Sequence, residues 1–140
     1  HDSKRGVVAA IHAGWRGAVA GIVPNTLALL KSRLGSQPDY VRVSIGPSAG
    51  VCCYEVDEPV LQSLRQQWAG WEKVVRSRRN GNACLDLKML VREQTLGAGV
   101  SPHSITTVNL CTICHEELFF SYRREGKVNG TMLSAIGMVS

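Results

Sequence analysis

His12 and Arg16 are the first residues whose types and spacing suggest chemistry. They lie in the stretch His-Ala-Gly-Trp-Arg-Gly at residues 12–17, which follows the apolar run 7–11 and precedes apolar residues at helical spacing. A strand that passes through a glycine-containing turn into a helix brings polar side chains, free backbone N–H groups and the positive end of the helix dipole to one place. An imidazole and a guanidinium there suit a small anionic or polar ligand. A buried histidine and a surface arginine around a tight turn are the other interpretation of this stretch.

A second set of candidates lies toward the carboxyl end, where Cys111 and Cys114 form a Cys-x-x-Cys motif. Half of a zinc ribbon has this spacing, but the sequence has no second Cys-x-x-Cys or histidine pair to complete it. Cys52 and Cys53 are adjacent, and adjacent cysteines rarely share a tetrahedral metal, so we expect them to serve in packing. We expect Cys111, which follows a predicted strand, to line a pocket, and a nucleophilic pairing of Cys111 with a histidine also remains open.

Tyr122 and Arg123 lie in an aromatic and basic stretch, Phe-Phe-Ser-Tyr-Arg-Arg at residues 119–124. An aromatic ring can stack on a flat base and an arginine can bind an anion, although the two phenylalanines could equally be core. The residues predicted to bind substrate are therefore Arg16, Cys111, Tyr122 and Arg123.

The composition is that of an ordinary globular protein. The 140 residues include 44% hydrophobic and 19% charged side chains, which predicts a single domain over residues 1–140 with a substantial core. The net charge of +5 includes a basic patch at residues 73–79 without interleaved aromatics, so nucleic acid is not expected as a partner. The sequence has no apolar run of membrane-spanning length, so no membrane contact is expected. The sequence contains five cysteines and no export signal, which predicts reduced thiols in a cytoplasmic protein.

Strands and helices that alternate along the chain must position these side chains. β-rich or alternating stretches predict strands at residues 7–11, 39–45, 73–76, 83–85, 105–110 and 131–139. Apolar residues at helical spacing predict helices over 19–34, after the N-cap residues Asp57 and Asp86, and over 116–122. Pro24 should kink or restart the first helix, and Asn80-Gly81 predicts a hairpin and hence a mixed sheet. The last strand should contribute core residues, namely Met132, Ala135 and Met138.

Three blocks of the sequence resemble the YfiH family, also called the laccase-domain or polyphenol oxidase family. The first is the stretch at residues 12–17, and the second is Ile-Gly-Pro-Ser-Ala-Gly-Val-Cys-Cys-Tyr-Glu-Val at residues 45–56. The third combines Cys-Thr-Ile-Cys at 111–114 with Leu-Phe-Phe-Ser-Tyr-Arg-Arg-Glu-Gly at 118–126. Ser48 and Val51 replace a cysteine and a proline that are usual in the family. Because the blocks follow the family's order, the chain is identified as the carboxyl-terminal part of a family member.

The resemblance implies an α+β fold, a layered α/β sandwich with mixed β-sheets, here expected without its amino-terminal part. It also implies that His12 is one of three ligands of a catalytic zinc, the others being a histidine and a cysteine upstream of this chain. An upstream segment of the same protein, or another chain, is then expected to supply them. The residues predicted to be catalytic are His12 and Arg16, and His12 is the predicted metal ligand.

Two enzymatic activities are implied by the resemblance. One is the phosphorolysis of adenosine, inosine or methylthioadenosine, with some adenosine deamination, which needs an anion site and a stacking surface. The other is copper-dependent polyphenol oxidation by a laccase, which needs many imidazoles. The chain has four histidines and no His-x-His pair, so we predict zinc rather than copper, and a purine nucleoside with phosphate as substrates. A non-catalytic fragment and a role in the quality control of cell-wall precursors are further alternatives.

Overall fold

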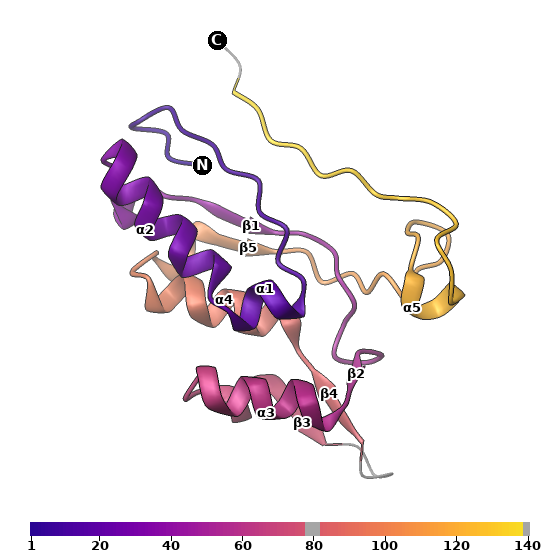
Figure 1. Cartoon of the computed structure of the whole chain (residues 1–140). Helices are drawn as coiled ribbons and strands as arrows, with labels where there is room; N and C mark the ends of the chain where they lie inside the picture. The colour runs from indigo at the N-terminus through magenta and orange to yellow at the C-terminus, as the bar shows by residue number, and fades with distance from the viewer. Residues whose placement is uncertain (78–81, 139–140) are drawn as a thin grey trace.

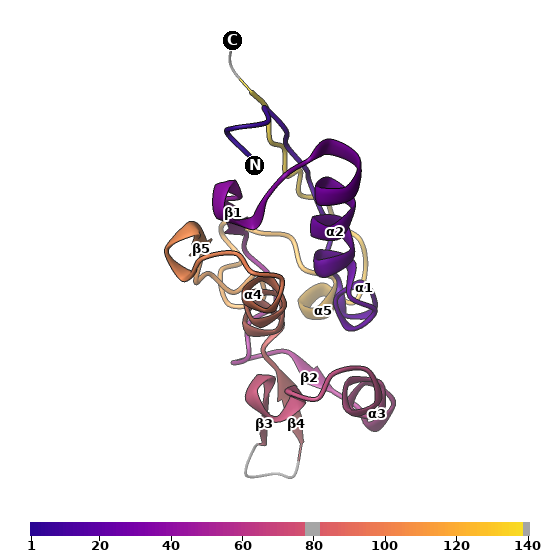
Figure 2. The ribbon, with the colours of Figure 1, turned by 90° about the vertical axis from the view of Figure 1, so that its left-hand side faces the viewer.

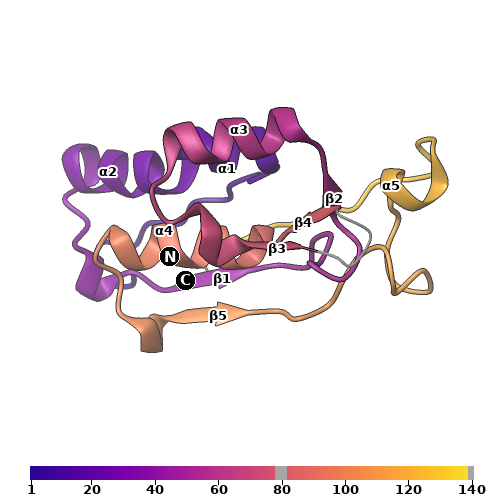
Figure 3. The same cartoon turned by 90° about the horizontal axis from the view of Figure 1, so that it is seen from below.

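The core of the fold is built around helix α4 (Leu87–Gly97). The computed structural model describes residues 1–77 and 82–138. Leu90 and Thr95 of α4 are fully buried. The helix lies between a two-stranded sheet on one side and helices α1 (Trp15–Val19) and α2 (Ile22–Leu34) on the other (Figures 2 and 3). The strand pair, α4 and the α1–α2 helices therefore form successive layers around the main core.

The two-stranded sheet pairs strands that are far apart in the sequence. Strand β1 (Val43–Ile45) runs parallel to β5 (Ile105–Thr107), with Val43 opposite Ile105. Because parallel strands need a long crossover connection, the chain between them contains α3, the second sheet and α4. The parallel pairing brings the carboxyl ends of both strands to the same edge, where the loops predicted to carry chemistry begin (Figure 1).

The second sheet is antiparallel and has the strand order β2–β4–β3. Strand β2 (Glu55–Val56) pairs with β4 (Ala83–Leu85), which also pairs with β3 (Val75–Ser77), and helix α3 (Glu58–Gln67) contributes buried apolar residues to the core. The predicted turn at Asn80-Gly81 lies outside the described residues, although the strands on either side pair as a hairpin requires. The parallel and antiparallel sheets together confirm the predicted α+β fold with mixed sheets.

Local sequence signals set the helix boundaries. The carboxylate of Asp86 accepts a hydrogen bond of 3.0 Å from the backbone N–H of Met89 and so caps α4, as predicted. Gly35 follows α2 with a φ of +69°, a conformation that favours glycine. The predicted helix over 19–34 forms from Ile22 as α2, and Pro24 lies in its first turn, where proline is tolerated. None of the helices in the described ranges is long and apolar enough to cross a membrane.

The two terminal strands predicted from the sequence do not form within the described residues. Within the described residues, Val7 makes an isolated bridge with Asp2, and the segments 7–11 and 131–138 form no strand ladder (Figures 1 and 2). A strand needs a neighbour that completes its ladder of hydrogen bonds, and the described part of the chain offers neither segment one. The predicted core residues of the last strand are instead exposed, namely Met132 (51%), Ala135 and Met138 (54%).

The remaining elements are short, and two of them correct predicted bounds. Residues 116–118 form a turn, and the predicted helix over 116–122 is replaced by α5 (Tyr122–Glu125). The hydroxyl of Ser121 accepts a hydrogen bond from the N–H of Arg124 and so caps this helix. The strand predicted at 73–76 begins at Val75 because a 3₁₀-helix precedes it. The 3₁₀-helices are Pro38–Tyr40, Trp71–Val74 and Pro102–Ser104.

Candidate functional site

The loop after β1 and the segment after β5 lie beyond the carboxyl ends of these two strands (Figure 1). The loop after β1 contains Ser48, the segment after β5 contains Cys111, and these two residues form an isolated parallel bridge. The backbone N–H of Thr112 also donates to the carbonyl oxygen of Ser48 at 3.1 Å. The pairing of the strands is thus extended past their ends, which holds the two loops side by side.

Tyr54 is a site residue that the sequence patterns did not predict. Its ring is buried, and the guanidinium carbon of Arg123 lies 5.0 Å from the ring centroid. Arg123 also donates through Nη1 to the carbonyl oxygen of Glu55 at 3.1 Å. Burial raises the pKa of Tyr54, while the charge and a hydrogen bond of Arg123 and the charge of Arg16 act in the opposite direction. The hydroxyl of Tyr54 therefore stays protonated at neutral pH, within the electrostatic reach of two guanidinium groups.

Arg16 lies in α1, and its guanidinium carbon is 4.6 Å from the centroid of the Trp15 ring. The side chain is exposed, and its charge acts on Tyr54. Helix α1 has only five residues, so it lacks the strong dipole that the sequence pattern led us to expect. Binding of an anion here would therefore depend on arginine side chains. Arg123 contacts the Tyr54 ring, and the charge of Arg16, near the opposite end of the sequence, also acts on the Tyr54 hydroxyl.

His12 is exposed in the segment before α1. Its Nε2 atom lies 3.1 Å from the position that a Cβ atom on Gly14 would occupy, which explains why the turn favours glycine there. In the part of the chain that the structure describes, the group of potential metal ligands does not include His12. The described residues therefore do not form a zinc site around His12 by themselves, and its role as a metal ligand stays a prediction.

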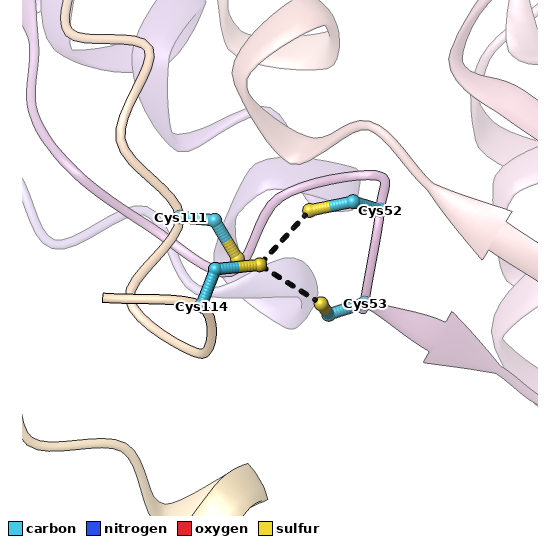
Figure 4. A group of neighbouring side chains, drawn as sticks. All are labelled: Cys52, Cys53, Cys111 and Cys114. Atoms are coloured by element: carbon cyan, nitrogen blue, oxygen red, sulfur yellow. Dashed lines mark hydrogen bonds between the residues drawn. The ribbon is translucent and has the colours of Figure 1, made fainter. Parts of the chain in front are cut away.

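Four cysteines form the group of potential metal ligands in the described residues. The Sγ atoms of this cysteine cluster, Cys52, Cys53, Cys111 and Cys114, all lie within 4.8 Å of one another (Figure 4). The Sγ atom of Cys114 lies 3.6 Å from that of Cys52 and 3.3 Å from that of Cys53. The expectation that the adjacent cysteines do not join the other two is therefore wrong. It failed because spacing along the sequence does not show which loops the parallel strands β1 and β5 bring together.

Cys111 is the buried member of the cysteine cluster. Its thiol accepts a hydrogen bond of 3.2 Å from the backbone N–H of Gly50. Burial alone would raise its pKa, but the backbone N–H groups of Gly50, Cys114 and Ile113 lower the pKa to about 6. The pKa of Cys53 is raised by its hydrogen bond with Cys114 and by burial. Cys111 and Cys53 therefore differ in acidity, and Cys111 is the more readily deprotonated of these two thiols.

Arg124 organises the backbone of residues 111–125. Its guanidinium forms an ion pair of 2.6 Å with Glu125 and donates to carbonyl oxygens at 2.9, 3.2 and 2.8 Å, those of Thr112, Ile113 and Phe119. Nδ1 of His115 also lies against the backbone, 3.0 Å from the carbonyl oxygen of Cys111. Because Arg124 is occupied in this way, Arg123 is the arginine of the adjacent pair that is exposed to a ligand.

The five residues predicted from the sequence to form the site do not all lie together, and His12 is in the segment before α1. Arg123 contacts the Tyr54 ring, and the charge of Arg16 acts on the Tyr54 hydroxyl. Tyr122 precedes Arg123 at the start of α5 and is 67% exposed. Cys111 is buried in the cysteine cluster, and its predicted contact with substrate stays a prediction. The structure therefore places Arg123 against the Tyr54 ring and assigns Cys111 to a separate group.

Comparison with known proteins identifies the family of this chain. The family model described as multi-copper polyphenol oxidoreductase laccase matches residues 1–139. The chain belongs to the YfiH, or laccase-domain, family. The resemblance that the three sequence blocks carry is thereby confirmed.

Curated relatives in the family act on purine nucleosides. Purine nucleoside phosphorylase YlmD of Geobacillus stearothermophilus is 41% identical over 133 residues, which cover 94% of this chain and 48% of the relative. The purine nucleoside phosphorylase of Bacteroides thetaiotaomicron is 36% identical and covers 97% and 51%. Adenosine deaminase RL5, from an unknown prokaryotic organism, is 33% identical and covers 96% and 52%. The chain therefore spans about half the length of these relatives.

Solved structures from the family share the fold. Bacillus licheniformis hypothetical protein YfiH superimposes with a TM-score of 0.84 at 36% identity, covering 89% of this chain and 47% of that protein. YlmD from Geobacillus stearothermophilus superimposes with a TM-score of 0.75 at 42% identity, covering 81% and 42%. Both results confirm the YfiH-like α+β fold that the resemblance implied.

Proposed function

We propose that this chain supplies the phosphate-binding and base-stacking part of a purine nucleoside phosphorylase. Arg16 and Arg123 bind the phosphate, the hydroxyl of Tyr54 donates a hydrogen bond to the bound anion, and Tyr122 stacks on the purine. The substrates are then phosphate and a purine nucleoside such as adenosine, inosine or methylthioadenosine. The purine nucleoside chemistry of the curated relatives supports this choice of substrate class.

The contact of Arg123 with the Tyr54 ring, together with the charge of Arg16 that acts on the same hydroxyl, is the observation that supports the proposal most strongly. Guanidinium groups present forked donors that match the oxygens of a phosphate, and two of them balance its charge better than one. Both arginine side chains are exposed, so a substrate can reach them. Since the pKa of Tyr54 is raised, its hydroxyl keeps its proton at neutral pH and provides a third donor.

These residues suit the chemical demands of phosphorolysis. A phosphate oxygen attacks the C1′ carbon of the sugar while the bond from C1′ to the purine nitrogen breaks, and the sugar becomes positively charged in the transition state. A phosphate held by two arginines is already positioned for this attack, and its negative charge stabilises the sugar cation. The accessible ring of Tyr122, which is 67% exposed, offers a surface for the purine.

His12 is not part of these steps. We propose zinc as the metal that His12 binds, with the further ligands contributed by an upstream segment of the same protein or by another chain. Among the described residues, no group of potential metal ligands includes His12. The steps above are therefore assigned to the arginines and tyrosines and make no use of a zinc ion.

Adenosine deamination is a second candidate activity, which the relationship to adenosine deaminase RL5 favours. It replaces the amino group of the purine through attack by water and consumes no phosphate. Polyphenol oxidation, which the family description names, is less well supported, because the four histidines of the chain include no His-x-His pair for a copper cluster. Phosphate dependence therefore separates the first candidate from the other two.

Purine release from inosine at varied phosphate concentration tests the proposal, using the protein expressed at the length that its gene encodes. Arg16→Ala is expected to raise the KM for phosphate about tenfold, equivalent to about 1.4 kcal/mol, because a charge-assisted contact is lost. Arg16→Lys should recover part of this loss, since lysine keeps the charge but not the forked donors.

Arg33→Ala is the matched control, because Arg33 is an exposed arginine in the last turn of α2. It should leave the phosphate KM unchanged. An Arg16→Ala variant with the phosphate dependence of the wild type would refute the proposed role of Arg16. Deamination of adenosine without any phosphate-dependent purine release would support the second candidate, and a protein without either activity would support the non-catalytic alternative.

A further inference from the structure

We propose that Cys52, Cys53, Cys111 and Cys114 bind one structural zinc ion. This site is distinct from the metal predicted at His12, because the cysteine cluster finds all of its ligands within this chain. Four thiolates around one ion form a closed tetrahedral site, which leaves no position for a substrate. The ion would therefore stabilise the fold rather than take part in the reaction, and this inference does not depend on the proposed function.

The positions of the four sulfur atoms fit tetrahedral coordination. Zinc–sulfur bonds of about 2.3 Å place the sulfurs of a tetrahedral site about 3.8 Å apart. The Sγ atoms all lie within 4.8 Å of one another, and Cys114 lies 3.6 Å and 3.3 Å from Cys52 and Cys53 (Figure 4). Shifts of about 1 Å or less would therefore complete the coordination geometry.

The backbone beside Cys111 also suits a metal-bound thiolate. The N–H of Gly50 donates to the Sγ atom of Cys111 at 3.2 Å, and hydrogen bonds of this kind orient the ligands of metal sites. A Cβ atom on Gly50 would lie 3.1 Å from the Cβ of Cys111 and 3.2 Å from the Sγ of Cys52. Glycine at position 50 therefore allows the two loops to approach closely enough for the four sulfurs to converge.

Disulfide formation is the other chemistry open to thiols at this separation. One disulfide would join two sulfurs at about 2.05 Å and would not account for the positions of the other two. A single ion accounts for the approach of all four sulfurs to within 4.8 Å of one another. Among metal ions, tetrahedral sites with four thiolate ligands are typical of zinc, which neither gains nor loses an electron there.

The position of the cluster explains what the ion would stabilise. Cys53 directly precedes Tyr54, and Cys114 lies in the segment whose backbone Arg124 binds. The ion would therefore connect the loop that carries Tyr54 to the segment that leads to Arg123. The ion would lie past the carboxyl ends of β1 and β5, where the bridge between Ser48 and Cys111 already joins the two segments.

The zinc content of the purified protein tests this proposal. Cys114→Ser is expected to lower the content by about one zinc per chain relative to Cys84→Ser, since one ligand of a four-thiolate site is lost. Cys84 is the matched control, because it lies in β4 and is not a member of the cluster. His12→Ala is expected to retain this ion, which distinguishes the cysteine cluster from a site at His12.

Cobalt substitution gives a second measurement that needs no cysteine variant to fold. Cobalt-loaded wild-type protein and the His12→Ala variant should both show the intense visible bands of tetrahedral Co²⁺ and the ultraviolet charge-transfer bands of thiolate ligands. The proposal would be overturned by zinc retained in Cys114→Ser, by cobalt protein without thiolate bands, or by copper or iron in the place of zinc. A thiol count that showed the cluster oxidised to disulfides as isolated would also overturn it.

Discussion

Replacement of Arg123 by alanine is expected to lower kcat/KM for phosphorolysis about 100-fold, equivalent to about 2.7 kcal/mol of transition-state stabilisation. Arg123 lies 5.0 Å from the centroid of the Tyr54 ring and donates to the carbonyl oxygen of Glu55 at 3.1 Å. Its loss would remove a phosphate contact and also a contact that positions the Tyr54 phenol. For this reason the effect should exceed that of Arg16→Ala.

Steady-state kinetics with inosine and phosphate measure this effect. Arg123→Lys should remain well below the wild type, because lysine keeps the charge but cannot reproduce the forked donors or the contact of the planar guanidinium with the ring. Arg33→Ala again provides the control for removal of an exposed arginine. If Arg123→Ala retained kcat/KM within twofold of the wild type, Arg123 would have no part in the proposed site.

Arg124→Ala is expected to act through stability, lowering the free energy of unfolding by about 2 kcal/mol. Arg124 is mostly buried, and its guanidinium donates to three backbone carbonyl oxygens and pairs with Glu125. Without it these partly buried acceptors lose their donor, and the segment that leads to Arg123 loses its internal connections. Catalytic activity should therefore fall together with stability, although Arg124 is not proposed to contact substrate.

Urea unfolding of the wild type and the variant measures the change in free energy. Arg124→Lys should recover only part of it, because one ammonium group cannot reach the three carbonyl oxygens and Glu125 together. Arg123→Ala is the matched comparison, since its exposed side chain is expected to matter more for catalysis than for stability. Equal unfolding free energies for Arg124→Ala and the wild type would show that these hydrogen bonds contribute nothing net.

Helices with a strong apolar face and a clear cap could be predicted from the sequence. Asp86 begins α4, and its carboxylate accepts the capping hydrogen bond from Met89. The helix after Asp57 also forms, although without a side-chain hydrogen bond from its cap. These elements are determined locally, because each combines the periodicity of its buried residues with a signal at its first turn.

Strands were predicted less well because a strand depends on a distant partner. The β-branched run at 7–11 is apolar enough for a buried strand, yet in the described residues only Val7 forms a bridge. The segment 131–138 was also predicted as a strand, and Met132 and Leu133 are exposed there. Composition indicates that a segment favours extended structure, but the partner that completes the ladder cannot be found from local sequence.

The candidate site was predicted in part for the same reason. Arg16 and Arg123 could be named from their motifs, but the contact of Arg123 with the Tyr54 ring joins segments that are far apart in the sequence. Tyr54 was missed, although it directly follows the adjacent cysteines in the second family block. The four cysteines were separated by an argument from sequence spacing, whereas the loops that carry them meet in the fold.

The phosphate KM of four proteins tests the central claim, that Arg16 and Arg123 bind the same phosphate. The proteins are the wild type, Arg16→Ala, Arg123→Ala and the double variant, each assayed for purine release from inosine. Residues that share one ligand are expected to show a coupling of about 0.5–3 kcal/mol, so the double variant should differ from the sum of the single changes by at least the lower value. Strictly additive changes, or purine release that is independent of phosphate in the wild type, would contradict the claim.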